Sequence, residues 1–364
     1  MRIIIKDKYD DVCYWLACYI KNTIIKHTMY DNNQRPFILG LPTGSSPIGI
    51  YKYLIDFYNK DELSFKNVIT FNMDEYVGLS PDHPQSYNFF MWNTFFNHID
   101  IPRENVNILQ GIHSNMEKQA EEYEEKIKSY GGIDLMLGGL GEDAHIAFNE
   151  PGSSFSSITR LKTLNTNTIN ANSRFFDKDE IIPKVAITMG IQTIMDAKEV
   201  CIIVSGEKKA IALKNSIGDG INHNYPASIL QFHKKCCFVV DEDATDELQV
   251  KTVKYYKGLQ KDIDCMGNSI RNNIISEIKS TDNVLILSPH PDDDVIGMGA
   301  ILQALPNKQN VKIAYMTSGE NGVNHENKFI RETEAISSLK TLGYNKADIS
   351  FLKLPFYYDK TCTN

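Results

Sequence analysis

Short apolar runs and longer helical patterns alternate along the first two thirds of the chain. The apolar runs predict buried strands at residues 36–41, 68–79 and 133–137. Helical spacing of apolar or charged residues predicts helices at residues 9–30, 86–99 and 116–130. Strand, helix, strand and helix are then predicted at residues 185–190, 191–197, 199–206 and 207–217. This alternation is typical of an α/β fold with a mostly parallel, doubly wound sheet.

Residues 158–184 interrupt the alternation because they are polar and lack strong periodicity. Such a segment favours a mobile lid over a site rather than a scaffold element. It contributes Arg160, Lys162 and Arg174, which are either phosphate ligands or ordinary surface charges. Arginine suits the first role because its planar fork of N–H groups matches phosphate oxygens.

A second α/β unit is predicted after a long, charge-rich, helical stretch that ends near Asp282. Residues 283–302 predict a strand, a turn and a helix, and another strand (VKIAY) and another helix (FIRETEAISSLKTLG) follow. We therefore predict a first domain at residues 1–265, a helical linker at 266–282, and the start of a second, incomplete α/β domain at 283–364.

The composition is that of an ordinary soluble protein. With 364 residues, 42% hydrophobic and 23% charged, two domains are expected. A net charge of −8 without a long basic run argues against nucleic acid or a membrane surface as a partner. The chain begins without an apolar signal region, and no stretch approaches the length of a membrane span. Seven cysteines without a CxxC motif fit reduced thiols, with Cys236 and Cys237 at apolar strand positions, so the cytoplasm is predicted.

The stretch IDLMLGGLGEDAHIAFNEPGSS, residues 133–154, concentrates the candidate chemistry. Its predicted strand breaks into three glycines, which permit a tight turn and close approach of a ligand to the backbone. Asp143, His145 and Glu150 follow at the carboxyl end of the strand, where α/β sheets bind ligands. These side chains suit an acid/base relay, but they are also possible zinc or iron ligands, or solvated turn residues.

Other predicted strand ends also carry polar residues. Residues 43–46 join a strand to a helix, where backbone N–H groups, hydroxyls and the helix dipole favour a phosphate. The alternative there is a Ser/Thr-capped helix start with Pro47 at an early position. Asp74 and Glu75 follow the apolar start of the 68–79 strand, and Lys209 lies just past a later strand as a phosphate contact or a solvated charge.

Five motifs follow one another along the chain: LGLPTGSSP, FNMDEYVGL, GGLGEDAHIAFNEPGSS, TRLKTL and ANSRFFD. By the order and spacing of these motifs, residues 1–265 resemble the glucosamine-6-phosphate deaminase (isomerase) family. The resemblance implies a Rossmann-like fold and the conversion of glucosamine 6-phosphate and water to fructose 6-phosphate and ammonia. It implies a hydrolase of amino-sugar catabolism that needs no metal and no organic cofactor. The chain departs from the family at GEDAH, where GNDGH is usual, so Ala144 adds a Cβ to the turn.

The resemblance also implies roles for single residues. His145, oriented by Asp143 and Glu150, would open the pyranose ring, and Asp74 would be the general base that moves a proton between carbons. The partner, a small-molecule sugar phosphate, would be bound by Thr43, Gly44, Ser45, Arg174 and Lys209. Allosteric activation by N-acetylglucosamine 6-phosphate would use Ser153, Arg160, Lys162 and Tyr255. Such regulation needs a homo-oligomer, commonly a hexamer in the family.

Three later motifs, PHPDDD, TSGENG and RETEA, resemble the N-terminal part of the LmbE/PIG-L-like N-acetylglucosaminyl deacetylases, which are zinc hydrolases. By this resemblance His290 and Asp293 would bind zinc and Asp292 would activate a water. The family's further histidine ligand has no counterpart, because His325 lies in a turn that does not match its position. We therefore expect vestigial metal ligands and no deacetylase activity.

Two other functions are open to the first domain. A phosphogluconolactonase-like hydrolase would share the fold but would not need Asp74 as a base at carbon. A non-catalytic sugar-phosphate sensor would keep the fold without turnover. The presence of Asp74, Asp143, His145 and Glu150 together argues against the sensor.

Overall fold

The chain divides into two units, Met1–Gly258 and Leu259–Asn364, each with a hydrophobic core of its own. The computed structural model describes residues 1–30, 35–165, 169, 176, 182–261, 283–288, 302, 310–316, 327–341, 344 and 346–352. The boundaries predicted at residues 265 and 282 fall outside the described residues and stay predictions.

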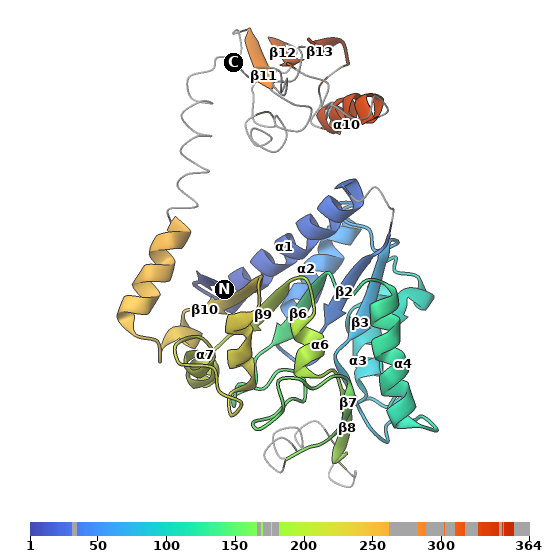
Figure 1. The fold of residues 1–364 in the computed structure, drawn as a ribbon, viewed down its shortest axis with the longest axis vertical. Coiled ribbons are helices and arrows are strands. Elements are labelled where there is room, and N and C mark those ends of the chain that lie inside the picture. The colour runs from blue at the N-terminus through green and yellow to red at the C-terminus, as the bar shows by residue number, and fades with distance from the viewer. Residues whose placement is uncertain are drawn as a thin grey trace, which may run out of the picture. The chain divides into compact units, whose positions relative to one another are not determined.

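The first unit is built on a seven-stranded sheet whose neighbouring strands are all parallel (Figure 1). In spatial order the strands are β1 (Arg2–Lys6), β10 (Cys236–Asp241), β9 (Val200–Val204), β6 (Leu135–Gly139), β2 (Phe37–Leu41), β3 (Val68–Asn72) and β5 (Val106–Asn107). Its central strands are apolar along their whole length because both faces of the sheet are covered. The predicted doubly wound α/β sheet is confirmed.

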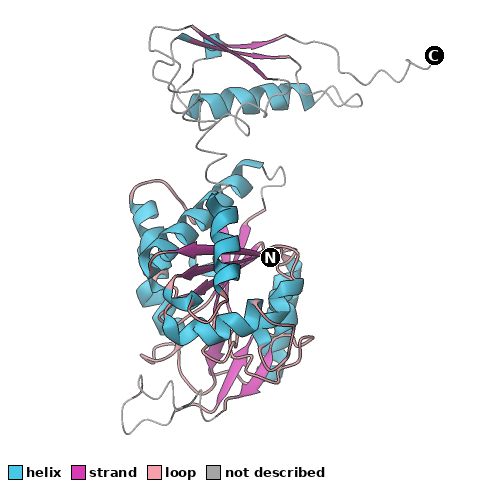
Figure 2. Ribbon diagram, turned by 90° about the vertical axis from the view of Figure 1, so that its left-hand side faces the viewer, coloured by secondary structure: helices cyan, strands magenta, loops and turns pink. Residues whose placement is uncertain are grey.

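Helices cover both faces of this sheet (Figure 2). One face carries α1 (Tyr9–Tyr30), α2 (Ile48–Asn59) and α3 (Tyr87–Thr94), and the other carries α4 (Met116–Ser129), α6 (Ile191–Met195) and α7 (Ala210–Ile217). Short 3-10 helices lie at Phe96–His98, Arg103–Asn105, Glu207–Lys209, Pro226–Phe232 and Asp243–Thr245, and a helix spans 250–261. Apolar spacing explains the packing, since Val12, Leu16 and Ile20, four residues apart, are all buried.

The chain reverses direction across the sheet between β2 and β6. After β2, the strands β3 and β5 add on one side, whereas β6, β9 and β10 add on the other. The connections from β2 and β6 therefore leave in opposite directions, and a crevice forms outside the carboxyl ends of these strands. The fold itself thus marks where a ligand should bind.

A small antiparallel sheet begins where β3 ends. It consists of β4 (Asp74–Tyr76), β8 (Val185–Thr188) and β7 (Arg160–Thr163). The single strand predicted at 68–79 is therefore wrong, because the backbone of Met73 bonds to Leu41 and Met189 and separates β3 from β4. The prediction that β8 continues the parallel sheet is wrong for the same reason, since β8 pairs with β4 instead.

The lid predicted at 158–184 is wrong in its first part. Residues Arg160–Thr163 form β7, a strand of the antiparallel sheet, and not a mobile segment. Residues 166–168, 170–175 and 177–181 lie outside the described residues, so the rest of the prediction stays untested there.

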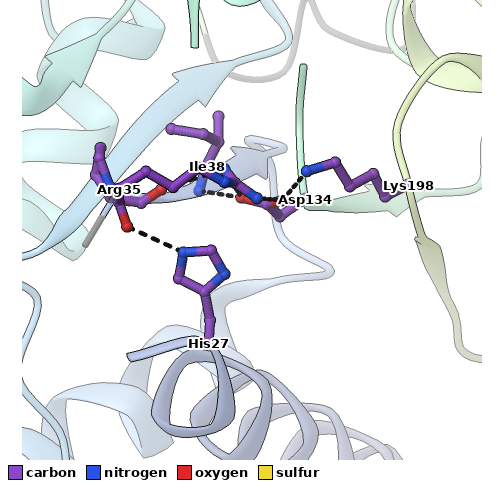
Figure 3. A network of polar contacts seen from close by, with 6 residues as sticks. His27, Arg35, Ile38, Asp134 and Lys198 are labelled. Atoms are coloured by element: carbon purple, nitrogen blue, oxygen red, sulfur yellow. Dashed lines mark hydrogen bonds and ion pairs between the residues drawn. The ribbon is translucent and has the colours of Figure 1, made fainter. Parts of the chain in front are cut away.

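One buried carboxylate joins the starts of three neighbouring strands (Figure 3). Asp134, directly before β6, accepts hydrogen bonds from Arg35 Nη1 and Nη2 at 2.9 and 2.5 Å. It also accepts from Lys198 Nζ at 2.7 Å and from the Ile38 N–H at 2.9 Å. His27 Nε2 contacts the Arg35 carbonyl at 3.0 Å. Burial alone would raise the pKa of Asp134, but the bonds from Arg35 and Lys198 outweigh it and lower this pKa.

The second unit contains a parallel sheet of β11 (Val284–Ser288), β12 (Val311–Tyr315) and β13 (Ile349–Phe351), with α10 (Asn327–Thr341). Apolar residues of these strands and of α10 form its core. The two strands and the later helix predicted for this region are confirmed, whereas the helix predicted within residues 283–302 lies almost wholly outside the described residues. In neither unit does a described helix combine the length and the hydrophobicity that crossing a bilayer requires.

Candidate active site

A cavity of about 540 Å³ lies at the carboxyl ends of β2, β3, β6 and β9. Segments that are far apart in the sequence form its walls, because the switch in chain direction brings these strand ends together. Among the predicted catalytic residues, Asp74, Asp143 and His145 line the cavity. The predicted binding residues that line it are Thr43, Gly44, Ser45 and Lys209.

Two tyrosine hydroxyls hold the loop at residues 42–46. Tyr51 on α2 donates a hydrogen bond to the Pro42 carbonyl at 2.5 Å. Tyr9 on α1 donates to the Ser46 carbonyl at 3.0 Å. These bonds anchor both ends of a loop whose backbone and hydroxyls form one wall of the cavity.

The same loop contains no helix cap. Pro47 is the N-cap residue of α2, and no side chain caps this helix. The alternative of a Ser/Thr-capped helix start is therefore wrong, and the hydroxyls of Thr43 and Ser45 serve no such purpose. Gly44 has a φ of 88°, a left-handed conformation that glycine adopts without strain.

His145 and Asp143 form a close polar pair in the cavity. The Nδ1 atom of His145 lies 2.5 Å from Asp143 Oδ1. With Nδ1 protonated toward the carboxylate, Nε2 is the basic nitrogen, so the pair can accept and return a proton. Burial alone would raise the pKa of Asp143, but the hydrogen bond with His145 outweighs burial and lowers this pKa.

The turn that carries this pair contains Gly141 and also Ala144, where the family pattern usually has glycine. A Cβ on Gly141 would lie only 2.2 Å from His145 Nδ1, so only glycine leaves room for the imidazole. Ala144 adopts a φ of 63° in the left-handed region, which costs an alanine roughly 1–2 kcal/mol. The carbonyl of Ala144 accepts a hydrogen bond from Ala227 N–H at 2.9 Å. This hydrogen bond holds the backbone of Ala144 in the turn.

Asp74 is the buried first residue of β4. Burial raises the pKa of Asp74 to about 8, and the charge of neighbouring Glu75 adds to the rise. Such a carboxylate is a stronger base than an ordinary aspartate and suits the removal of a proton from carbon.

Lys209 brings a cation to the cavity from the end of β9. The loop before it is held by Asp241, at the end of β10. The Asp241 carboxylate accepts hydrogen bonds from the Ser205 hydroxyl, from Gly206 N–H at 2.9 Å and from Ala244 N–H at 3.0 Å. The positive charge suits a phosphate in a cavity that also contains carboxylates.

An aromatic wall of the cavity was not predicted from the sequence. Tyr76 lies at its centre, with ring centroids 5.0 Å from Tyr87, 5.4 Å from Phe148 and 5.9 Å from Phe176. All four line the cavity. Local sequence does not separate these rings from core aromatics, since Tyr76 lies in a predicted strand and Tyr87 in a predicted helix.

Not every predicted catalytic residue lines the cavity. Glu150 is buried, and its carboxylate accepts the backbone N–H of Asn165 at 3.0 and 3.2 Å. Within the described residues, no three His, Cys, Asp or Glu side chains are arranged to hold a metal ion. Asp143, His145 and Glu150 thus do not form the metal cluster that their residue types allow.

Other predicted residues fall elsewhere. Arg174 lies outside the described residues. Ser153 is buried beyond the cavity, and Arg160 and Lys162 lie on β7. Tyr255 lies in the helix at 250–261 with 61% of its surface exposed. The allosteric assignment of these four residues stays a prediction.

Comparison with known proteins shows the family of the first unit. Residues 10–238 match the family described as glucosamine-6-phosphate isomerases/6-phosphogluconolactonase. The chain belongs to this isomerase/lactonase family. In this family member, the matched region contains every described residue that lines the cavity.

The chain aligns with named relatives over most of their length. Glucosamine-6-phosphate deaminase from Borreliella burgdorferi (strain ZS7) is 55% identical over 262 residues, 72% of this chain and 97% of that protein. Glucosamine-6-phosphate deaminase 1 from Bos taurus is 54% identical over 260 residues, 71% and 89% of the two chains. A solved structure of a monomeric glucosamine-6-phosphate deaminase is 37% identical, with a TM-score of 0.63 over 68% of this chain and 100% of that chain.

The second unit has a separate match. Residues 285–363 match the family described as GlcNAc-PI de-N-acetylase, which confirms the resemblance predicted for 283–364. His290, Asp292, Asp293 and His325 lie outside the described residues. Their predicted roles therefore stay predictions.

Proposed function

We propose that the first unit is a glucosamine-6-phosphate deaminase, a hydrolase of amino-sugar catabolism that forms fructose 6-phosphate and ammonia. The observation that carries this proposal is the placement of Asp74 and the His145–Asp143 pair in one cavity. Ring opening and proton transfer at carbon need two separate acid/base groups, and these two sites supply them. The 55% identity to a named deaminase over 97% of its length supports the substrate.

His145 would open the pyranose ring. Its Nε2 takes the proton of the C1 hydroxyl and returns a proton to the ring oxygen, which leaves a C1 aldehyde. Asp143 holds the imidazole in place through the 2.5 Å contact with Nδ1 and stabilises the imidazolium that forms. The aldehyde in turn makes the hydrogen at C2 acidic.

Asp74 would then transfer a proton between carbons. Its carboxylate removes the C2 proton while the C1 oxygen takes up a proton, which gives an enolamine. Asp74 then donates a proton to C1 as the amine nitrogen gives one up, which leaves an imine at C2. Addition of water to this imine releases ammonia and leaves the C2 ketone of fructose 6-phosphate. The raised pKa of Asp74, about 8, favours proton removal from a weak carbon acid.

The phosphate would bind where the loop at residues 43–46 and Lys209 line the cavity. The backbone and hydroxyls at residues 43–46 precede α2, whose amino end favours an anion. Lys209 adds a positive charge. Arg174, by its match to the family pattern, is the third proposed phosphate ligand. A chain with a net charge of −8 needs such local cations to attract its substrate.

The proposal includes activation by N-acetylglucosamine 6-phosphate at Ser153, Arg160, Lys162 and Tyr255. Two observations support such a second site. Ser153 Oγ is buried, and no described residue forms a hydrogen bond with it. Arg160 pairs with Thr188, which pairs in turn with Asp74, so one antiparallel ladder joins the two sites. The homo-oligomer that regulation requires stays a prediction.

The main test is ammonia release from glucosamine 6-phosphate by the purified protein. In deuterium oxide, the fructose 6-phosphate formed should carry deuterium at C1, because Asp74 exchanges its proton with solvent. Asp74→Asn should lose about 10²-fold or more in turnover. The matched control, Asp82→Asn, replaces an exposed aspartate of a nearby loop and should keep full turnover.

A phosphogluconolactonase would give the opposite result. It would hydrolyse 6-phosphogluconolactone, incorporate no deuterium at carbon, and release no ammonia. For the regulatory site, N-acetylglucosamine 6-phosphate should stimulate ammonia release in the unmodified protein and lose this effect in Arg160→Ala. Equal stimulation in both proteins would refute the proposed allosteric site.

A further inference from the structure

Glu75 is a buried glutamate beside Asp74 that the proposed reaction does not use. Only 1% of this residue is exposed. Its Oε1 accepts hydrogen bonds from the N–H groups of Tyr76 at 2.8 Å and Tyr87 at 2.9 Å, and its Oε2 accepts from Asn88 N–H at 2.9 Å. A carboxylate tolerates such burial only when donors surround it. Both oxygens are therefore required as acceptors.

These donors connect two walls of the cavity. Tyr76 belongs to β4, the strand that carries Asp74, whereas Tyr87 and Asn88 form the first turn of α3. Both tyrosine rings line the cavity. Side chains alternate along a strand, so Asp74 faces the cavity while Glu75 reaches α3 on the other side. One side chain thus links the strand of the candidate base to the helix that carries the aromatic wall.

We propose that Glu75 is a positioning residue for the deamination proposed above: it fixes Asp74 against Tyr87 and keeps a second negative charge beside the base. This inference rests on the proposed function. A glutamine at this position would offer one acceptor oxygen for three donors and would carry no charge. An aspartate would keep the charge, but its side chain is one methylene shorter and cannot reach α3 in the same way.

The charge has a defined effect on Asp74. Burial raises the pKa of Asp74 to about 8, and Glu75 adds to the rise by repulsion. Burial also raises the pKa of Glu75 to about 7, against the effect of its three backbone hydrogen bonds. The charge of Glu75 therefore opposes ionisation of the base.

Other titratable groups face Asp74 from neighbouring elements. Burial, with a contribution from the Asp74 charge, raises the pKa of Tyr51 on α2, Tyr87 on α3 and Tyr123 on α4 well above 10. Burial likewise raises the pKa of Tyr76 to about 12. These phenols stay neutral while Asp74 titrates. Among the described residues that line the cavity, the other charged or titratable ones are Glu142, Asp143, His145 and Lys209.

The test is the pH dependence of kcat/KM in the full chain. In Glu75→Gln, the acidic limb should move to lower pH by about one unit, because the repulsive charge is gone. Turnover should also fall by about 10-fold or more, because Asp74 and Tyr87 lose their common anchor. In Glu75→Asp, the limb should stay in place while turnover falls.

Glu124→Gln is the matched control. Glu124 on α4 is also buried, and its Oε1 accepts bonds from Thr159 N–H at 2.9 Å, Thr159 Oγ1 at 2.5 Å and Thr193 Oγ1 at 2.6 Å. Its replacement should lower stability without moving the acidic limb. A limb that stays in place in Glu75→Gln, or that moves equally in Glu124→Gln, would overturn the inference.

A second measurement keeps the inference separate from the proposed function. Carbon-13 NMR titration of the Asp74 carboxyl in the ligand-free protein needs no substrate. Its pKa should be lower in Glu75→Gln than in the unmodified chain, and an equal pKa would overturn the inference. If Glu75→Gln does not fold, unchanged turnover in Glu75→Asp would overturn it instead. Absence of ammonia release from the unmodified chain would refute only the deaminase proposal.

Discussion

Gly141→Ala should disable the proposed ring-opening step while leaving the fold intact. The new Cβ would lie 2.2, 2.3 and 2.5 Å from the Nδ1, Cε1 and Cγ atoms of His145. Ordinary contact begins at 3.4 Å, so the imidazole must move by about 1.2 Å or the backbone must yield. Such a movement of the ring would lengthen its 2.5 Å contact with Asp143 beyond hydrogen-bond range.

The cost follows from the size of this displacement. A catalytic group that is misplaced by about 1 Å typically loses roughly 10²-fold in rate. General acid/base catalysis contributes roughly 10²- to 10⁴-fold, which sets the upper limit of the loss. We therefore expect kcat to fall by about 10²-fold. The binding of the phosphate should change less, because the loop at residues 43–46 follows β2 and not β6.

The assay is steady-state ammonia release, with the free energy of unfolding measured by urea denaturation. Gly220→Ala is the matched control, because a Cβ there meets nothing within 4 Å. It should keep normal turnover. Turnover of Gly141→Ala within about threefold of the unmodified chain would refute the reasoning, since the 10²-fold loss would be absent.

Four further predictions concern Asp74, Asp134 and the boundary between the two units. The kcat/KM of the unmodified chain should rise with pH through about 8, because burial raises the pKa of Asp74 to that value and the base must be ionised; a limb near 3.8 would contradict this. The same raised pKa means that Asp74 costs folding stability as pH rises from 3.8 through 8, so urea denaturation should show the stability of Asp74→Asn gaining on that of the unmodified chain over this range. Asp134→Asn should lower the free energy of unfolding by about 2 kcal/mol at neutral pH, measured with urea. Because the pKa of Asp134 is lowered, this difference should shrink as pH falls below 3.8. A constant difference would speak against the network of Asp134 with Arg35 and Lys198. A chain that ends at Lys261 should keep ammonia release, because every residue assigned to that chemistry precedes it; loss of activity would mean that the second unit completes the first.

Local chemistry in the sequence was enough to predict most elements and part of the site. Apolar runs predicted β2, β6 and β9, and helical spacing predicted α1 and α4, because burial against a neighbouring layer imposes these periods on the sequence. The glycine-rich turn with Asp143 and His145 could be located because a parallel strand must end before its ligand-binding loop. Both residues line the cavity, as do Asp74 and Lys209.

Only the tertiary structure decided which of these residues meet. The break at Met73 depends on hydrogen bonds to Leu41 and Met189, which are distant in the sequence, so no local pattern separates β3 from β4. The sites of Tyr76 and Tyr87 on the cavity wall depend on Glu75, whose three donors come from two elements. Periodicity records that a side chain is buried, but not which partner buries it. The change of chain direction between β2 and β6 decides which strand ends share the cavity, and Asp74, Asp143 and His145 all line that cavity.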